Sequence, residues 1–276
     1  VEGGAGNDTL IAGDGKDTVQ GGAGNDVIKA DAGDDCITGG SGSDSIEGGA
    51  GNDYLVGGDS TDFDKDTIRG GTGNDTILGG NGDNQFFGDE GNDSIDGGSG
   101  SDTLDGGTGD DIVNGGDGND SLNGGLGNDT IFSGAGNDYI DDVGSNTDYI
   151  DAGQDNDLID LKGDSSSTVI GGAGSDTLQI ASNGLNFNDA NDNQIQGIEL
   201  IKFGYGANIN LDNQSEGLNY VLANASTTVN FTVSLGSTAA CPDSATLTST
   251  ASVGGLISKS NKVSYCGFLL LAIVKP

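Results

Sequence analysis

A nine-residue unit dominates the sequence. It is first complete as "GGAGNDTLI" at residues 3–11, and close copies follow one another across about the first 180 residues. Each copy contains two or three glycines, one aspartate and one large apolar residue. A nine-residue period is too short for a helical hairpin repeat, and the apolar spacing does not fit the 3.6-residue period of a helix. The repeat therefore predicts an all-β chain of the β-solenoid type.

The large apolar residue sets the register of nineteen units. The spacing is nine residues, except for thirteen before Ile68 and ten before both Ile150 and Val169. We expect these side chains to face the interior as a single row. The row consists of Leu10, Val19, Ile28, Ile37, Ile46, Leu55, Ile68, Ile77, Phe86, Ile95, Leu104, Val113, Leu122, Ile131, Ile140, Ile150, Ile159, Val169 and Leu178.

An aspartate stands two positions before the apolar residue in seventeen of the nineteen units, and Asn84 and Ser167 are the exceptions. Of the 44 acidic residues only five are Glu, which leaves 39 Asp, so the repeat uses the shorter acidic side chain. The row of carboxylates consists of Asp8, Asp17, Asp26, Asp35, Asp44, Asp53, Asp66, Asp75, Asp93, Asp102, Asp111, Asp120, Asp129, Asp138, Asp148, Asp157 and Asp176.

The residue types predict how one unit folds. Its last three residues, such as Thr9–Ile11, suit a very short strand whose middle side chain points inward. Its first six residues must reverse the chain, and glycine allows the positive φ angles and close stacking that a tight reversal needs. Two units then form one 18-residue coil, with strands on opposite faces and the apolar row between them.

The predicted core is too small to stabilise such a coil alone. Burying one aliphatic side chain contributes about 1.5–3 kcal/mol, whereas ordering the backbone costs about 1–2 kcal/mol for each of the nine residues. Stacking also brings like charges together, with Asp8 near Asp26 on one edge and Asp17 near Asp35 on the other. Calcium binds about six to eight oxygens from carboxylates and main-chain carbonyls. We therefore expect multiple Ca²⁺ ions between stacked turns.

Composition excludes several classes of function. A net charge of −35 with only nine Lys and Arg residues excludes nucleic acid as a partner, because phosphates would be repelled. Low hydrophobicity with high net charge is otherwise typical of disorder, so folding is expected to depend on the cation. Without any His the chain has no Ser/His/Asp or HExxH site, and we expect no enzymatic activity. The longest apolar run, Phe268–Val274, is too short to span a membrane.

Six units keep nearly all of the pattern GGxGxDxUx, where U is a large apolar residue. They are Gly21–Lys29, Gly48–Val56, Gly70–Leu78, Gly97–Asp105, Gly115–Asn123 and Gly124–Phe132. This tandem pattern resembles the RTX nonapeptide repeat of proteins secreted by Gram-negative bacteria, and the resemblance covers about residues 1–180. It implies a right-handed parallel β-roll of 18-residue coils, with calcium held by aspartates and by carbonyls of the Gly-rich turns. It also implies export by a type I secretion system before calcium-driven folding.

Carried over residue by residue, the resemblance assigns the seventeen aspartates above as side-chain ligands of calcium. It assigns main-chain carbonyl ligands to Gly21, Gly22, Gly24, Gly39, Gly40, Gly42, Gly97, Gly98, Gly100, Gly115, Gly116 and Gly118 and their counterparts. Asn84 and Ser167 replace the carboxylate, so weak or absent sites are expected there. The insertion Thr61–Lys65 is expected to form a solvated acidic loop, since no complete EF-hand loop surrounds Asp62. Cys36 is expected to face outward.

The periodicity stops at Ala181, and residues 181–276 are predicted to be a β-rich capping, assembly or export region. Its segment "QGIELIKFG" at residues 196–204 is similar to sequence that often follows such repeats. Cys241 and Cys266 form a disulfide in one interpretation and remain separate in the other. Short strands are expected at Ile195–Phe203, Asn208–Leu211, Tyr220–Ala223 and Thr228–Leu235.

Two interpretations of the first residues stay open. Val1 falls on the inward position of a unit that has no turn, so either the chain is cut from a longer array or another subunit covers this end in a head-to-tail filament. The apolar Phe268–Val274 is compatible with a buried strand, an export signal or an adhesive strand.

The preferred hypothesis is a calcium-binding structural protein, extracellular or at the cell surface, in a surface layer, adhesin or filament. Its expected partners are calcium, further copies of itself or a cell-surface polysaccharide. The alternative is the C-terminal secretion and folding module of a larger RTX exoenzyme or toxin. An ice-binding surface is disfavoured, because the third position of successive units forms no Thr or Asn ladder.

Overall fold

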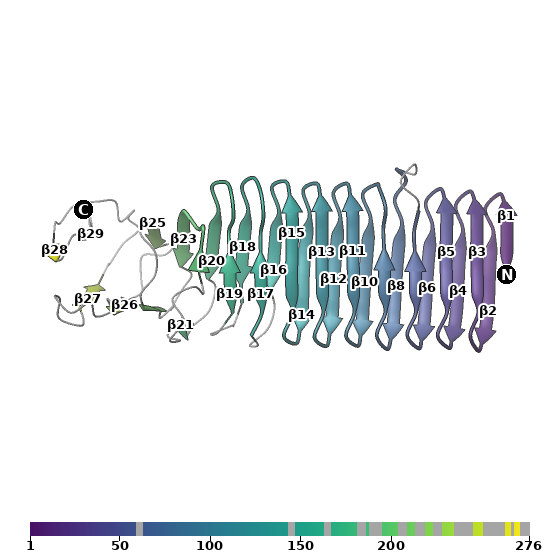
Figure 1. Ribbon diagram of the computed structural model, residues 1–276, viewed down its shortest axis with the longest axis horizontal. Helices are drawn as coiled ribbons and strands as arrows, with labels where there is room; N and C mark the ends of the chain where they lie inside the picture. The colour runs from purple at the N-terminus through teal and green to yellow at the C-terminus, as the bar shows by residue number, and fades with distance from the viewer. Residues whose placement is uncertain are drawn as a thin grey trace.

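Two long parallel sheets face each other and form the walls of a solenoid (Figure 1). The computed structural model describes residues 1–58, 63–142, 147–162 and 167–180, and beyond them 186–187, 195–203, 209–212, 219–222, 228–234, 245–250, 263–265 and 268–270. Within these residues every element is a β-strand. Consecutive strands alternate between the two sheets, so each pair of strands makes one coil of a right-handed β-roll of about nine turns. This confirms the predicted fold class.

The first sheet contains the odd-numbered strands of the repeats in sequence order. It consists of β1 (Glu2–Ala5), β3 (Thr18–Ala23), β5 (Cys36–Ser41), β7 (Tyr54–Val56), β9 (Thr76–Leu78), β11 (Ser94–Ser99), β13 (Ile112–Asp117), β15 (Thr130–Ala135), β17 (Tyr149–Asp151), β19 (Thr168–Ile170) and β22 (Ile195–Gln196).

The second sheet contains the strands between them. It consists of β2 (Thr9–Asp14), β4 (Val27–Ala32), β6 (Ser45–Ala50), β8 (Thr67–Thr72), β10 (Gln85–Glu90), β12 (Thr103–Thr108), β14 (Ser121–Leu126), β16 (Tyr139–Asp142), β18 (Leu158–Leu161), β20 (Thr177–Ile180), β23 (Leu200–Phe203) and β25 (Asn219–Leu222). Smaller sheets pair β21 (Asn186–Phe187), β24 (Ile209–Asp212), β26 (Thr228–Ser234) and β27 (Ala245–Thr250), and β28 (Val263–Tyr265) with β29 (Phe268–Leu270).

The register between coils follows the predicted period. Ile95 of β11 pairs with Val113 of β13, eighteen residues later. Ile46 pairs with Ile68 because the four extra residues between them lengthen that coil without shifting the register. The paired apolar side chains form one buried row between the sheets, from Val19 to Leu178, and Leu10 is partly buried at its start. The inward apolar row is therefore confirmed.

The predicted strand length is wrong for most units. Most repeat strands have six residues and not three, and the turn between β3 and β4 keeps only residues 24–26. The cause lies in the ladder, because pairing continues through the glycines, as Gly22 pairs with Gly40 and Ala23 with Ser41. In the parallel ladder, hydrogen bonds join the backbones of the Gly pairs as well as those of the apolar residues. The first two glycines of a unit thus belong to the strand.

The structure tests the strands expected beyond residue 180 and the outward position of Cys36. The strands expected around residues 208–211, 220–223 and 228–235 are confirmed as β24, β25 and β26. The single strand expected over Ile195–Phe203 is wrong, because the chain crosses there from β22 in the first sheet to β23 in the second. Both main sheets continue past Ile180, since β19 pairs with β22 and β20 with β23. The division at residue 180 itself stays a prediction. Cys36 is exposed, as expected, whereas Cys241, Cys266 and Asp62 lie outside the described residues. Of the apolar Phe268–Val274, only Phe268–Leu270 is described.

No helix long and apolar enough to cross a membrane occurs among the residues that the structure describes.

Candidate metal centres

The repeat aspartates form two rows, one along each edge of the solenoid, at the last position of each turn. Within a row, the side chain of one Asp accepts a hydrogen bond from the main chain of the Asp one coil earlier. The N–H of Asp8 donates to Oδ1 of Asp26 at 2.8 Å, and on the opposite edge the N–H of Asp17 donates to Oδ1 of Asp35 at 2.7 Å. The predicted stacking of these pairs is confirmed. The hydrogen bond itself was not predicted, and it offers a reason for Asp over Glu, because the carboxylate must stay close to its own backbone.

The second carboxylate oxygen of most row members is buried without any hydrogen-bond partner. Asp102 shows the pattern, since only 1% of the residue is exposed and Oδ2 has no donor within reach. An isolated ionised oxygen in such a place is strongly destabilising unless a positive group compensates it. The unpartnered Oδ2 atoms belong to Asp8, Asp26, Asp35, Asp53, Asp75, Asp93, Asp102, Asp111, Asp120, Asp129, Asp138, Asp157 and Asp176.

A glycine on the preceding strand lets this oxygen approach the main chain closely, because a side chain there would collide with it. A Cβ added to Gly97 of β11 would lie 2.5 Å from Oδ2 of Asp102 and 2.7 Å from the carbonyl oxygen of Gly115 on β13. A Cβ added to Gly115 would lie 2.5 Å from both Oδ2 of Asp120 and the carbonyl oxygen of Ser133. We call this arrangement of a strand glycine, the Asp Oδ2 of its turn and the next coil's carbonyl the oxygen cradle. Two oxygens from adjacent coils converge there.

The other glycines assigned by resemblance lie where the coils stack on each other. Gly98 and Gly100 have φ angles of 97° and 129°, which side chains rarely adopt. Their carbonyl oxygens face Gly116 and Gly118 of the next coil. The structure therefore brings Gly97 and Gly115 into the oxygen cradles, Gly98 into the ladder of β11 and Gly100 into the turn that follows it. A ligand role for any of these carbonyls stays a prediction.

Burial makes several carboxylates of the rows difficult to ionise in the absence of a cation. It raises the pKa of Asp75, Asp111 and Asp120 to about 7. The N–H bond to each of these carboxylates lowers its pKa, and the neighbouring carboxylates raise it further. Burial also raises the pKa of Asp102 and Asp129 to about 6. A bound cation would hold these groups ionised.

The donor set fits a hard cation. Among the described residues, no group of three or more His, Cys, Asp or Glu side chains converges to hold a metal ion. An ion in an oxygen cradle would therefore need carbonyl oxygens as well as carboxylates, and that all-oxygen combination is what Ca²⁺ accepts. The orphaned Oδ2 atoms and the missing Cβ atoms of the cradle glycines are both consistent with such an ion.

Two features of the turns escaped the sequence reasoning. The residue before each Asp often forms a second ladder of the opposite direction, as the N–H of Asn137 donates to Oδ1 of Asn119 at 2.7 Å. The recurring "ND" dipeptide was the available signal. In addition, Glu199 accepts a 2.7 Å hydrogen bond from the N–H of Asp176, so that a glutamate continues the Asp row beyond the last repeat.

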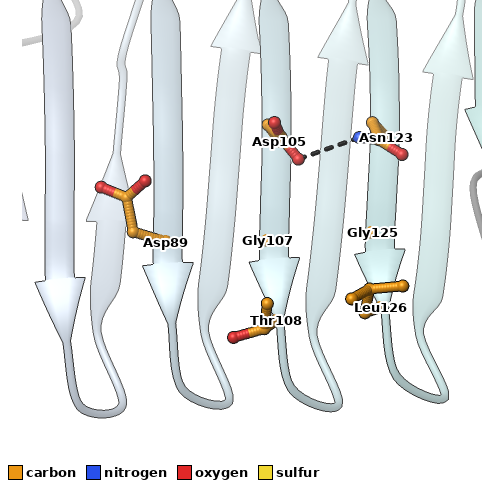
Figure 2. Close-up of a pocket in the computed structure, with 7 residues that line it drawn as sticks. All are labelled: Asp89, Asp105, Gly107, Thr108, Asn123, Gly125 and Leu126. Atoms are coloured by element: carbon orange, nitrogen blue, oxygen red, sulfur yellow. Dashed lines mark hydrogen bonds between the residues drawn. The ribbon is translucent and has the colours of Figure 1, made fainter.

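A shallow groove also lies on the outer face of the second sheet (Figure 2). Oδ1 of Asp105 accepts a 3.0 Å hydrogen bond from the amide of Asn123, and Asp89 pairs with Arg69. Figure 2 shows Asp89 pointing away from the Asp105–Asn123 pair. The groove is lined by Asp89, Asp105, Gly107, Thr108, Asn123, Gly125 and Leu126. Its carboxylates are already partnered, so it does not form a second metal centre.

Two rows of buried carboxylates at the turns of a parallel β-solenoid define a class of repeat proteins whose turns are built around cations. The family model of the RTX calcium-binding nonapeptide repeat matches residues 2–35, 29–64, 60–95, 79–113, 87–122, 96–131, 114–141 and 161–179, which together make up more than half of the chain. The chain belongs to this family of RTX calcium-binding repeats, as the resemblance implied. No curated protein sequence matches the chain significantly.

Proposed function

We propose that this chain is a calcium-binding extracellular structural protein whose repeats fold as Ca²⁺ enters the stacked turns. The observation that carries the proposal is the row of buried Oδ2 atoms without hydrogen-bond partners on each edge. Two rows in which most carboxylates keep an uncompensated oxygen are a large cost for a fold in which most units bury one large apolar residue. Divalent cations remove that cost and join successive coils.

The oxygen cradles indicate which residues would hold the ions. In the unit that begins at Gly97, these would be Oδ2 of Asp102 and the carbonyl oxygen of Gly115. The remaining repeat aspartates and the carbonyls of the corresponding strand glycines would act in the same way. A bound ion would supply positive charge and additional bonds between coils, while Oδ1 keeps its hydrogen bond to the preceding coil.

The charge and the family support an extracellular or cell-surface location. A net charge of −35 disfavours a compact chain until cations bind, and extracellular modules are the ones tuned to abundant calcium, with dissociation constants of about 10⁻⁴–10⁻³ M. Secretion by a type I system before folding is part of this proposal. So is a non-enzymatic role in a surface layer, adhesin or filament, with copies of the chain or a surface polysaccharide as partners.

A calcium titration tests the proposal. Chelated protein is titrated with Ca²⁺ and with Mg²⁺ while the far-ultraviolet circular dichroism spectrum and the number of bound ions are measured. We expect a cooperative change from a coil-like to a β spectrum with Ca²⁺ and several bound ions. A spectrum unchanged by Ca²⁺ would contradict the proposal. The mass of the calcium-loaded particle in solution then separates a polymerising structural protein from a monomeric module of a larger exoenzyme.

A further inference from the structure

One turn of the row differs from the others in two neighbouring residues. Asn84 takes the place of the aspartate, and Phe86 takes the place of the inward aliphatic residue. Both are fully inside, with exposures of 1% for Asn84 and 0% for Phe86. Every other inward residue of the nineteen units is Ile, Leu or Val. The two changes therefore occur together in a single unit.

Asn84 preserves the ladder of its row. Its Oδ1 accepts a 3.0 Å hydrogen bond from the N–H of Asp66, and its own N–H donates to Oδ1 of Asp102 at 2.7 Å. The difference lies on the other side of the side chain. In place of an acceptor without a partner, Asn84 has an amide Nδ2, which donates a 3.0 Å hydrogen bond to the carbonyl oxygen of Gly82 in the same turn.

The oxygen cradle of this unit is filled from inside. A Cβ added to Gly79 would lie 2.2 Å from the carbonyl oxygen of Gly97, 2.8 Å from Cε2 of Phe86 and 3.0 Å from Nδ2 of Asn84. At Gly97 of the next coil, the corresponding point faces Oδ2 of Asp102 and a carbonyl oxygen. The carbonyl oxygen of the next coil is kept, but an N–H donor and the edge of an aromatic ring lie where the ordinary unit has Oδ2 of its aspartate. Neither group binds a hard cation.

We propose that Asn84 and Phe86 close this turn with the chain's own groups, so that the coil between Asp66 and Asp102 is complete without calcium in its cradle. This inference rests on the proposed function, since it concerns which cradles take an ion. The neutral amide leaves no buried negative charge to compensate, and the edge of the ring fills the space beside it. A calcium-independent coil in the middle of the repeats gives the solenoid one stacked layer that exists before ions bind.

Ser167, the other residue that replaces a row aspartate, shows the same chemistry. Its hydroxyl accepts a 2.6 Å hydrogen bond from the N–H of Asp148 and lies 3.3 Å from Oδ2 of Asp148, to which it donates. A hydrogen-bond donor again takes over where most units leave a carboxylate oxygen without a partner. Both units that lack the carboxylate therefore carry an internal donor.

The test restores the aspartate and the aliphatic residue in the unit of Asn84, and it places an asparagine in the ordinary unit of Asp102. The double variant Asn84→Asp/Phe86→Ile restores the oxygen and opens the space, and Asp102→Asn is the matched control. Ions bound per chain are counted by native mass spectrometry at saturating Ca²⁺. We expect the double variant to bind one more ion than the unaltered chain and Asp102→Asn to bind one fewer. The single variant Asn84→Asp should gain none, because Phe86 still fills the cradle.

The outcomes separate the two proposals. An unaltered chain that binds no calcium overturns the proposed function. A chain that binds calcium and loses one ion in Asp102→Asn, with no gain in the folded double variant, overturns the present inference alone. An anomalous-difference map from crystals of the unaltered chain grown with Ca²⁺ gives an answer even if the double variant does not fold. Density at Gly97 and none at Gly79 is expected, and density at Gly79 would be decisive against the inference.

Discussion

The main-chain N–H of Asp102 donates a 2.8 Å hydrogen bond to Oδ1 of Asp120, one coil further along the chain. This bond fixes the orientation of the Asp120 carboxylate and thereby aims Oδ2 into the cradle beside Gly115. The two oxygens of one side chain have separate tasks, because one joins coils directly and the other needs an external partner. Substitutions that preserve only one of these tasks distinguish them.

Asp120→Asn should keep the ladder and lose the cradle oxygen, as Asn84 does in its own row. The chelated variant is expected to be more stable than the chelated parent at about pH 7.5, because one buried charge is removed, and it should bind one calcium fewer. Asp120→Ala also removes the acceptor of the Asp102 N–H, and should be less stable than Asp120→Asn by about 1–3 kcal/mol. Chemical denaturation in chelator and ion counting provide the two measurements.

Asp117→Ala is the control for these variants, since Asp117 is exposed at the end of β13. It should leave both the ion count and the denaturation midpoint close to those of the parent. Equal effects of Asp117→Ala and Asp120→Ala on calcium binding would show that general negative charge, and not the cradle, attracts the ions.

The metal-free fold should be more stable in mild acid than at neutral pH. Burial raises the folded-state pKa of Asp75, Asp111 and Asp120 to about 7, above the ordinary value of 3.8. The folded chain then binds more protons than the unfolded chain between these values, so the free energy of unfolding falls as pH rises through this window. The stabilising contribution is complete below the unfolded value and is lost near pH 7. In chelator, we expect a stronger β spectrum at about pH 5 than at about pH 7.5.

Calcium should reverse that dependence, because protons compete with ions for the same carboxylates. At saturating Ca²⁺ the β spectrum should be at least as strong at about pH 7.5 as at about pH 5. Asp111→Asn removes one of the titrating groups, and it should flatten the pH dependence seen in chelator. An unchanged slope in this variant would mean that overall charge repulsion, and not the buried row, controls the metal-free stability.

The nine-residue period is sufficient to predict the register, the inward row and the stacking of the aspartates. A uniform repeat leaves few alternative registers, and the pairing of Ile95 with Val113 illustrates this. Strand length does not follow from the period, since membership of Gly22 in a strand depends on pairing with Gly40 in another coil. The separate tasks of Oδ1 and Oδ2, and the filling of one cradle by Asn84 and Phe86, depend on side-chain directions that spacing alone does not specify.

Gly97→Ala should test the cradle from the side of the strand. The added Cβ would lie 2.5 Å from Oδ2 of Asp102 and 2.7 Å from the carbonyl of Gly115, so these atoms must move apart. We expect a loss of about 1–3 kcal/mol in the stability of the calcium-loaded protein, as for other overpacked cores, and one calcium fewer. Ala30 occupies the equivalent position of β4 and is fully buried. Ala30→Gly, the reverse change, should cost no more than about 0.5–1 kcal/mol and should lose no ion.

Asn119→Ala separates the outer ladder from the metal centres. Oδ1 of Asn119 accepts a 2.7 Å hydrogen bond from the N–H of Asn137, and both residues are exposed at the turns. Removing this acceptor returns an N–H group to water without leaving it buried, so the expected loss of stability is about 0.5–1.5 kcal/mol. The ion count should not change, because Asp120, the next residue, keeps both its ladder bond and its cradle. Asn119→Asp retains the acceptor and should behave like the parent in denaturation. A lost ion in Asn119→Ala would instead show that the outer ladder positions the carboxylates, and that the two ladders of each turn act as one unit.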